Sequence, residues 1–376
     1  MNARERLERI WRAGVERVRG DVAVRAALAD GSATDFSHVL AAGKAATAMA
    51  RAALEACPQV RQCLIVTKHG HDEAWTAGDS RVRVIEAGHP VPDENSLRAG
   101  EAAIRFVSGL AADAKLLLLV SGGASALVED MPEGMTLADL RARTEAMLAE
   151  GLDIHAINAR RKEISGVKGG KLLARFAGRE ALSLVISDVE GDAVSVVASG
   201  LGMVPQASGH TAMATEIIAS NAIARLACEE AADALDLETI VNDEALYGDV
   251  AAVAAKVADM VRQGAPGLYV FGGEPTVILP ASPGEGGRNQ ALAVLMAREL
   301  SGMADVAVLA AGTDGSDGPT AAAGGFVTGR DWARVPGGAQ ALAAANSGGW
   351  LRQAGGLFVT GPTGTNVMDL MLVVKG

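Results

Sequence analysis

Residues 116–125, LLLLVSGGAS, join an aliphatic run directly to a glycine-containing turn. A short aliphatic run predicts a strand buried on both faces, as at the centre of a parallel sheet. The turn, with Ser121, Gly122, Gly123 and Ser125, lets a ligand approach the backbone, and its successive N–H groups can form an anion-binding nest. A tight strand-to-helix turn without a ligand is the alternative interpretation. The stretch therefore predicts an α/β sheet with a candidate site where its central strand ends.

Strands and helices alternate on both sides of this strand. Before residue 205 we expect strands at 37–41, 63–67, 82–86 and 182–187, and helices at 2–30, 45–54, 95–110, 137–150 and 168–176. Beyond it we expect a long alanine-rich helix at 212–234, strands at 267–271, 276–279, 306–310 and 370–374, and a helix at 289–300. This alternation predicts a mostly parallel sheet with helices on both faces.

The length of 376 residues predicts two α/β domains, because a single hydrophobic core rarely grows beyond about 250–300 residues. We place the boundary within 205–240 and divide the chain into 1–215 and 216–376.

Composition excludes several classes of partner. The formal net charge is −11, with acids and bases mixed along the chain, whereas a nucleic-acid partner needs a concentrated basic face. No apolar stretch reaches the roughly 18 residues of a membrane span, and the first 30 residues lack the apolar core of a signal peptide. Cys57, Cys63 and Cys228 have no metal-binding spacing, which favours free thiols in a reducing cytosol. We therefore expect a soluble cytoplasmic protein.

Two further loops in the first half follow strands. Lys44 lies at the start of a helix, where unpaired N–H groups and a lysine favour an anion, although a solvated lysine at a turn is the alternative. Asp188, Glu190 and Asp192 follow the strand at 182–187. Carboxylates at such an edge suit a Mg²⁺ site or a general base, and a solvated acidic loop is the alternative.

The second half repeats this pattern with more glycine. Residues 271–274 and 284–290 place Glu274 near Arg288 and Asn289, and an arginine fork beside free N–H groups suits a phosphate or a carboxylate. The last two loops span 312–318 and 361–366, and their candidate phosphate-binding residues are Asp314, Gly315, Asp317, Thr363, Thr365 and Asn366. Taken together, the loops of both halves predict a site.

The strongest basic cluster spans 157–171 and includes Lys168. It is either a solvated face or a surface that attracts an acidic substrate. His89 falls in a loop after a strand, so it can approach a substrate. There is no G-x-G-x-x-G fingerprint with an acid about 20 residues on, which argues against a nicotinamide cofactor.

The ordered motifs from about residue 40 to the C-terminus resemble the glycerate 2-kinase family with a MOFRL domain. The motifs that carry the resemblance are AGKA (42–45), TKHGH (67–71), EAGHPVPD (86–93), SGGAS (121–125), VKGGK (167–171), ISD (186–188), GD (191–192), GEPT (273–276), GGRNQ (286–290), GTDGSDGP (312–319) and GPTGTN (361–366). The resemblance implies a Rossmann-like α/β/α first domain, a smaller α/β MOFRL domain and an active site in the cleft between them. It also implies ATP, Mg²⁺ and phosphorylation of the 2-hydroxyl of D-glycerate.

Carried onto this sequence, the resemblance makes Lys44, Asp188 and Arg288 the catalytic residues, with Asp188 and Asp192 as metal ligands. By this resemblance the turn at 121–125 and the last two loops bind the nucleotide. The residues that bind the acceptor are His89, Lys168, Glu274 and Asn289. A homodimer is left open.

The sequence departs from the family pattern at 201–206, at Ala291, where an acid is usual, and at Met368. These changes bear on the acceptor more than on phosphoryl transfer. Two rival functions therefore stay open: a kinase or reductase of another small hydroxy acid, such as a tartronate-related compound, and a non-catalytic nucleotide or anion sensor.

Overall fold

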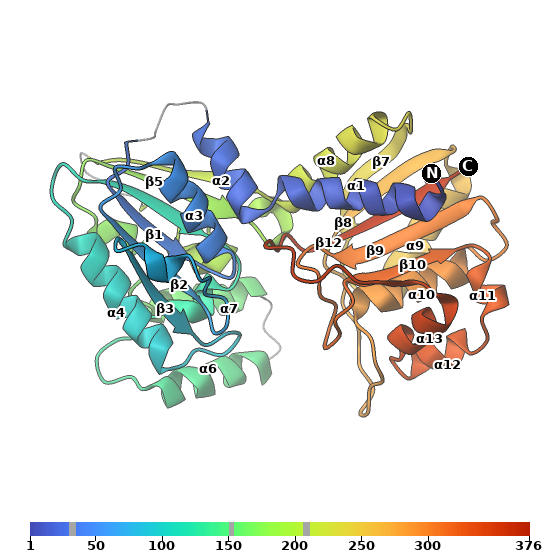
Figure 1. Ribbon diagram of the computed structural model, residues 1–376. Coiled ribbons are helices and arrows are strands. Elements are labelled where there is room, and N and C mark those ends of the chain that lie inside the picture. The colour runs from blue at the N-terminus through green and yellow to red at the C-terminus, as the bar shows by residue number, and fades with distance from the viewer. Residues whose placement is uncertain (30–34, 150–153, 206–210) are drawn as a thin grey trace. The chain divides into compact units, whose positions relative to one another are not determined.

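Two six-stranded sheets organise the computed structural model, one in each of two compact units (Figure 1). The structure describes residues 1–29, 35–149, 154–205 and 211–376. The N-terminal unit comprises Gly20–Ser220, and the C-terminal unit comprises Met1–Arg19 together with Asn221–Gly376. The first 19 residues, which the sequence groups with the first domain, thus belong to the other unit, because helix α1 (Ala3–Arg17) packs on α8 (Asn221–Asp233).

The sheet of the N-terminal unit is parallel, with strand order β3-β2-β1-β4-β5-β6. This is the order of the doubly wound Rossmann fold, in which the chain switches direction between β1 and β4. The strands are β1 (His38–Ala42), β2 (Gln62–Lys68), β3 (Val82–Ala87), β4 (Lys115–Val120), β5 (Glu180–Ile186) and β6 (Ala212–Ala219). The Rossmann-like fold predicted for this half is confirmed.

Helices cover this sheet because its central strands are apolar on both faces. All of β4 after Lys115 is buried. The helices of the unit are α2 (Gly20–Leu28), α3 (Ala46–Ala56), α4 (Glu94–Ser108), α5 (Ala124–Leu127), α6 (Leu137–Ala149) and α7 (Ile154–Ile164). Side chains of α4 share one apolar core with β1, β2, β4 and β5.

The C-terminal unit has a mixed sheet of order β11-β10-β9-β12-β8-β7, in which only β7 and β8 are parallel. The strands are β7 (Thr239–Leu246), β8 (Gly267–Gly273), β9 (Val306–Gly312), β10 (Gly324–Thr328), β11 (Leu357–Phe358) and β12 (Asp369–Lys375). Helices α1 and α8 pack on one face, and α9 (Val250–Gln263) and α10 (Arg288–Glu299) form the core of the other with Tyr269 and Phe271 (Figure 1). The helices α11 (Asp331–Arg334), α12 (Gly338–Ala343) and α13 (Ser347–Ala354) complete the unit.

Four predicted elements are wrong. The helix expected at 2–30 is two helices, α1 and α2, which pack in different units. The helix expected at 168–176 is a single 3₁₀ turn at Leu173–Arg175, because Gly169 and Gly170 adopt left-handed backbones with φ of 62° and 80°. The expected strand at 276–279 is reduced to one isolated bridge between Thr276 and Asp249.

The fourth error is the helix expected at 212–234. Its first part is the edge strand β6, and only Asn221–Asp233 is helical. Exposed and partly buried residues alternate along the first six positions of β6, and this period of two is that of a strand with one face covered. The high helix propensity of alanine concealed the alternation, because pairing with β5 outweighs propensity.

None of the helices in the described ranges combines the length and apolarity needed to cross a bilayer.

Candidate functional site

The loops after β1 and β4 begin side by side at the switch point of the parallel sheet. Ala42 and Val120 are paired in register. The Lys44 amide donates to the Gly122 carbonyl (3.0 Å), and the Ala45 amide donates to the Ser121 hydroxyl (3.1 Å). Ligands of open α/β sheets bind outside the carboxyl ends of the strands at this point. The structure therefore places the motifs of Lys44 and Ser121 in one candidate site.

Gly122 and Gly123 are the backbone around which three predicted residues gather. A Cβ at Gly123 would lie 3.0 Å from Cδ2 of His89 and 3.2 Å from Cγ of Lys44, and one at Gly122 would overlap Oδ2 of Asp188. Gly123 also has a left-handed φ of 88°, which strains any other residue. Lys44, His89 and Asp188 thus reach the same short stretch from three different loops.

Two lysines and a second histidine act on His89 at this point. Burial, together with repulsion from Lys44, Lys68 and His71, lowers the pKa of His89 to about 4. His89 is therefore a neutral imidazole at physiological pH. In the described part of the chain no carboxylate forms an ion pair with Lys44. A half-buried lysine of this kind is suited to an anionic ligand.

A strained segment lies beside the turn. Ala198, Ser199 and Gly200 have successive φ values of 49°, 56° and 75°, and left-handed backbones at non-glycine residues cost about 1–3 kcal/mol each. The hydroxyls of Ser125 and Ser199 are 2.8 Å apart. The segment also accepts hydrogen bonds from the amides of Gly169 and Gly170. Strained backbone of this kind persists only where the surrounding structure holds it in place, and it is found most often at ligand sites.

The acidic loop after β5 contributes Asp188 but no metal cluster. Asp192 ends the 3₁₀ turn Glu190–Asp192 with a left-handed φ of 54°. Among the described residues, no group of three His, Cys, Asp or Glu side chains is arranged to hold a metal ion. Mg²⁺ bound to a nucleotide needs only one or two protein carboxylates, since phosphates and water fill the other positions. The role of Asp188 and Asp192 as metal ligands therefore remains a prediction.

Lys168, a predicted acceptor-binding residue, is instead buried inside the N-terminal unit. It is 2% exposed and forms an ion pair with Glu129, which also accepts a hydrogen bond from the Ser165 hydroxyl (2.5 Å). Burial lowers the pKa of Lys168, against the attraction of Glu129. An ammonium held in this way has a structural role. The basic cluster at 157–171 gave no sign of it, because Glu129 lies 39 residues away along the chain.

Arg288 is the centre of the candidate site in the C-terminal unit. At the first position of α10, its Nε donates to Oδ2 of Asp369 (2.6 Å), its Nη2 donates to Oδ1 (3.2 Å), and its Nη1 lies 2.6 Å from Oε1 of Glu274. The two carboxylates raise the pKa of Arg288 above its ordinary value although burial opposes the charge. The predicted neighbours Arg288 and Glu274 are therefore in direct contact.

Asp369 is a buried partner of Arg288 that sequence reasoning missed. It is fully buried, and burial raises its pKa to about 6 against the pull of Arg288. Residue 369 begins β12 and pairs with both Gly273 and Gly312, so it lies between the ends of β8 and β9. The side chain of Asn221 fixes the chain here by donating to the carbonyls of Val367 (2.9 Å) and Asp369 (3.0 Å). An acid opening a buried strand just after the last glycine loop was the signal in the sequence.

The remaining predicted residues of this unit mostly hold its loops together. Asp317 caps α10 by accepting from the amides of Asn289 (3.0 Å) and Gln290 (2.8 Å), and Asn289 is only 1% exposed. The Thr365 hydroxyl donates to the carbonyl of Val18, and the Thr363 hydroxyl donates to that of Thr313, both at 2.6 Å.

The loops at 312–318 and 361–366 also pack against each other. A Cβ at Gly315 would overlap the carbonyl of Gly361. Asp314 accepts from the amide of Ser316 (2.8 Å), and Asn366 accepts from that of Met368 (3.2 Å). Asp317 and Thr365 are thus buried structural residues, whereas Asp314, Thr363 and Asn366 are partly exposed at the sheet edge.

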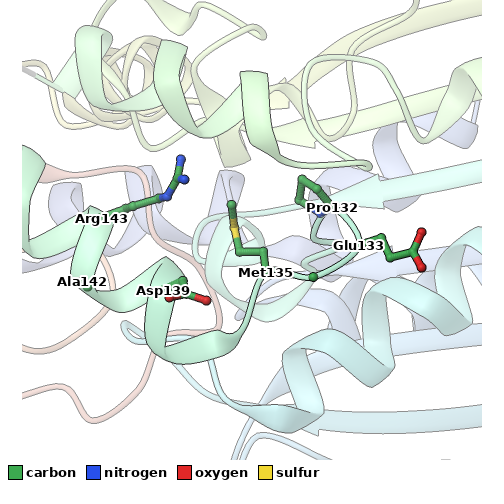
Figure 2. Close-up of a pocket in the computed structure, with 7 residues that line it drawn as sticks. Pro132, Glu133, Met135, Asp139, Ala142 and Arg143 are labelled. Atoms are coloured by element: carbon green, nitrogen blue, oxygen red, sulfur yellow. The ribbon is translucent and has the colours of Figure 1, made fainter.

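Each unit also contains an open cavity. One of about 390 Å³ in the N-terminal unit is lined by residues 132–135 and by α6, with Glu133 and Arg143 on opposite sides (Figure 2). It contains no predicted site residue. The other, of about 450 Å³ in the C-terminal unit, lies between α1 and residues 360–363 and includes Thr363.

Comparisons with known proteins give this geometry a family. A model described as a domain of unknown function (DUF4147) matches residues 6–236, and the MOFRL family model matches residues 267–369. The chain is 34% identical to the glycerate 2-kinase of Pyrococcus horikoshii over 90% of this chain and 87% of that protein. It is 33% identical to a putative hydroxypyruvate reductase of Agrobacterium vitis over 90% of this chain and 99% of that protein.

A solved structure of a similar protein supports the same family. The crystal structure of glycerate kinase from Thermotoga maritima matches with a TM-score of 0.90 at 31% identity, over 99% of both chains. With both family models in order along the chain, and relatives above 30% identity over most of its length, this chain belongs to the glycerate 2-kinase family.

Proposed function

We propose that this chain is an ATP-dependent glycerate 2-kinase, which transfers the γ-phosphoryl group of ATP to the 2-hydroxyl of D-glycerate and forms 2-phospho-D-glycerate. The observation that carries the proposal is the positive switch-point site, where Lys44 and the neutral His89 meet the bare backbone of Gly122 and Gly123. Both reactants are anions, and phosphoryl transfer depends on positioning and charge neutralisation more than on covalent chemistry.

Three residues divide the chemistry in this proposal. Lys44 neutralises negative charge on the phosphoryl group during its transfer. Asp188, whose carboxylate lies at Gly122, accepts the proton of the acceptor hydroxyl. Arg288 binds the acceptor carboxylate or the moving phosphoryl group with the edge of its guanidinium that Asp369 and Glu274 leave open. His89 accepts a hydrogen bond from the acceptor, since its imidazole is neutral.

The residues present fit a magnesium nucleotide. Asp188 supplies one carboxylate at the glycine turn, with Asp192 four residues further on, and Mg²⁺ would supply charge compensation on the phosphates. The chain's own residues orient the reactants. We also propose a cytoplasmic location, because Cys57, Cys63 and Cys228 are buried free thiols, as is usual in a reducing compartment.

The loop after β1 does not support reductase activity. The loop after β1 reads Gly43-Lys44-Ala45-Ala46 and lacks the three-glycine fingerprint that brings a dinucleotide pyrophosphate onto a Rossmann helix.

A coupled ADP-release assay over a panel of small hydroxy acids tests the proposal, with NADH oxidation on hydroxypyruvate as the control. We expect D-glycerate to give the highest kcat/KM, with strict dependence on ATP and Mg²⁺. Turnover of a different hydroxy acid would change the acceptor only. NADH oxidation without ATP use on any acid would overturn the kinase assignment, and no turnover together with tight nucleotide binding would favour a sensor.

A further inference from the structure

A cavity of about 480 Å³ lies within the C-terminal unit, apart from the switch-point turn that the sequence assigns to the nucleotide. Its walls come from the start of α9, the segment 277–284, helix α10 and residues 342–347. Cavities that hold cofactors and small ligands span about 300–1,000 Å³ and are lined mainly by apolar groups with a few polar ones. This cavity has the size of such a site.

Most of the wall is aliphatic. Val277, Leu279, Pro280, Leu295 and Leu342 all line it. At its mouth Ile278 is 90% exposed and Leu279 is 61% exposed. Adjacent large apolar side chains left to water in this way mark a surface that a ligand or partner covers.

Part of the wall is glycine backbone that precedes Arg288. Gly284, Gly286 and Gly287 line the cavity just before the first residue of α10. A Cβ at Gly287 would overlap the carboxyl of Asp317, so this loop is packed closely against residues 317–318. Arg288 itself lines the cavity while its guanidinium binds Asp369 and Glu274. The cavity therefore joins an aliphatic wall to the charged centre of this unit.

We propose that this cavity binds the nucleoside part of the phosphoryl donor, with the base against the aliphatic wall and the phosphates toward Arg288. The inference rests on the proposed kinase function. Glycerate carries an oxygen on every carbon and has no apolar surface to offer such a wall. The flat base of a nucleotide is the one reactant group with a large, weakly hydrated face.

The test uses a matched pair of substitutions on α9. Ala251 is half-buried in the cavity wall, and Ala255, one turn further along the helix, is exposed and outside it. Calorimetric titration of the wild-type protein, Ala251→Phe and Ala255→Phe with magnesium ADP and with magnesium pyrophosphate separates the base from the phosphates. We expect Ala251→Phe to weaken ADP binding by about tenfold or more, roughly 1.4 kcal/mol. Pyrophosphate affinity should not change, and Ala255→Phe should match the wild type.

Leu279→Asp provides a second variant that does not depend on a buried position, because Leu279 is 61% exposed. It should reproduce the selective loss of ADP affinity, with thermal denaturation showing an intact fold. Unchanged ADP affinity in both Ala251→Phe and Leu279→Asp overturns the proposal, and so does a change of oligomeric state alone, which would make the cavity an interface between copies. In those cases continued phosphorylation of glycerate leaves the kinase function standing. A wild-type protein that neither binds ADP nor phosphorylates glycerate overturns both.

Discussion

The two candidate centres differ in whether their charged side chains have ion-pair partners. In the N-terminal unit, Lys44 has no ion-pair partner among the described residues and His89 is neutral in a field of cations. In the C-terminal unit, Arg288 binds two carboxylates, and Asp317 is consumed in capping α10. The difference follows from topology, because a parallel switch point opens its loops outward, whereas β12 runs antiparallel between β8 and β9 and closes theirs.

This difference suggests a different kind of contribution to catalysis from each unit. An unpaired cation changes its interactions when an anion arrives, so it acts directly on the reacting charge. An arginine that already binds two carboxylates is held in place, so its contribution is geometric. The following predictions test this distinction, from the largest effect to the smallest.

Lys44→Ala should have the largest effect. Removing a positioned cation from a phosphoryl-transfer transition state costs on the order of 10³-fold or more in rate. Steady-state kinetics should show the loss in kcat, with an unchanged thermal unfolding midpoint because Lys44 is only partly buried and forms no ion pair within the described ranges. Lys256→Ala, at an exposed position on α9, is the control. Equal activity of the two variants would remove Lys44 from the site.

Arg288→Lys should cost about 10²-fold in kcat. Lysine keeps the charge but cannot bind both oxygens of Asp369 in the parallel geometry of a guanidinium fork. A purely electrostatic role would give less than about a threefold loss. The measurement that separates the two is kcat for Arg288→Lys beside Arg262→Lys, an exposed arginine paired with Asp259 and Glu299 in the same unit.

The stability of the two centres should respond to pH with opposite signs. The pKa of His89 is lowered to about 4, so the folded protein binds fewer protons than the unfolded chain, and stability is lost as pH falls from about 6.5 toward 4. The pKa of Asp369 is raised to about 6, so the folded protein binds more protons there, and stability is lost as pH rises from about 4 through 6.

Unfolding midpoints of the wild type, His89→Gln and Asp369→Asn between pH 4 and 8 check these signs. On acidification the difference in unfolding free energy between the wild type and His89→Gln should fall, by about 2 kcal/mol at most. Its advantage over Asp369→Asn should instead decrease as pH rises. Slopes of the same sign would contradict the contrast between the two centres.

Asp317→Ala should have the smallest effect, confined to stability. The loss of a helix N-cap costs about 0.5–2 kcal/mol, which chemical denaturation measures directly. Because Asp317 is 3% exposed and both its oxygens accept amides of α10, the KM for ATP should change much less than for Ala251→Phe. A large rise in that KM at unchanged stability would return Asp317 to the nucleotide site.

The sequence by itself determined the local features of this protein. The aliphatic run at 116–120 is the central strand β4, because a short run that is apolar on every side suits a strand covered on both faces. The order of motifs specified the family, and glycines at strand ends located the loops of both centres. Lys44, Asp188 and Arg288 were predicted as site residues in this way, since each lies within a few residues of a strand end or a helix start.

Only the tertiary structure decided which charges are partners and which are open to a ligand. Lys168 and Glu129 are 39 residues apart, and Arg288 and Asp369 are 81 apart. Lys168 reads as a surface cation in a basic cluster, yet the fold buries it on a carboxylate. Asp369 precedes the strand expected at 370–374, and only the strand register places it between the ends of β8 and β9. Ion pairing is set by distance in space, and nothing local in the chain encodes a contact that strand register and helix packing create.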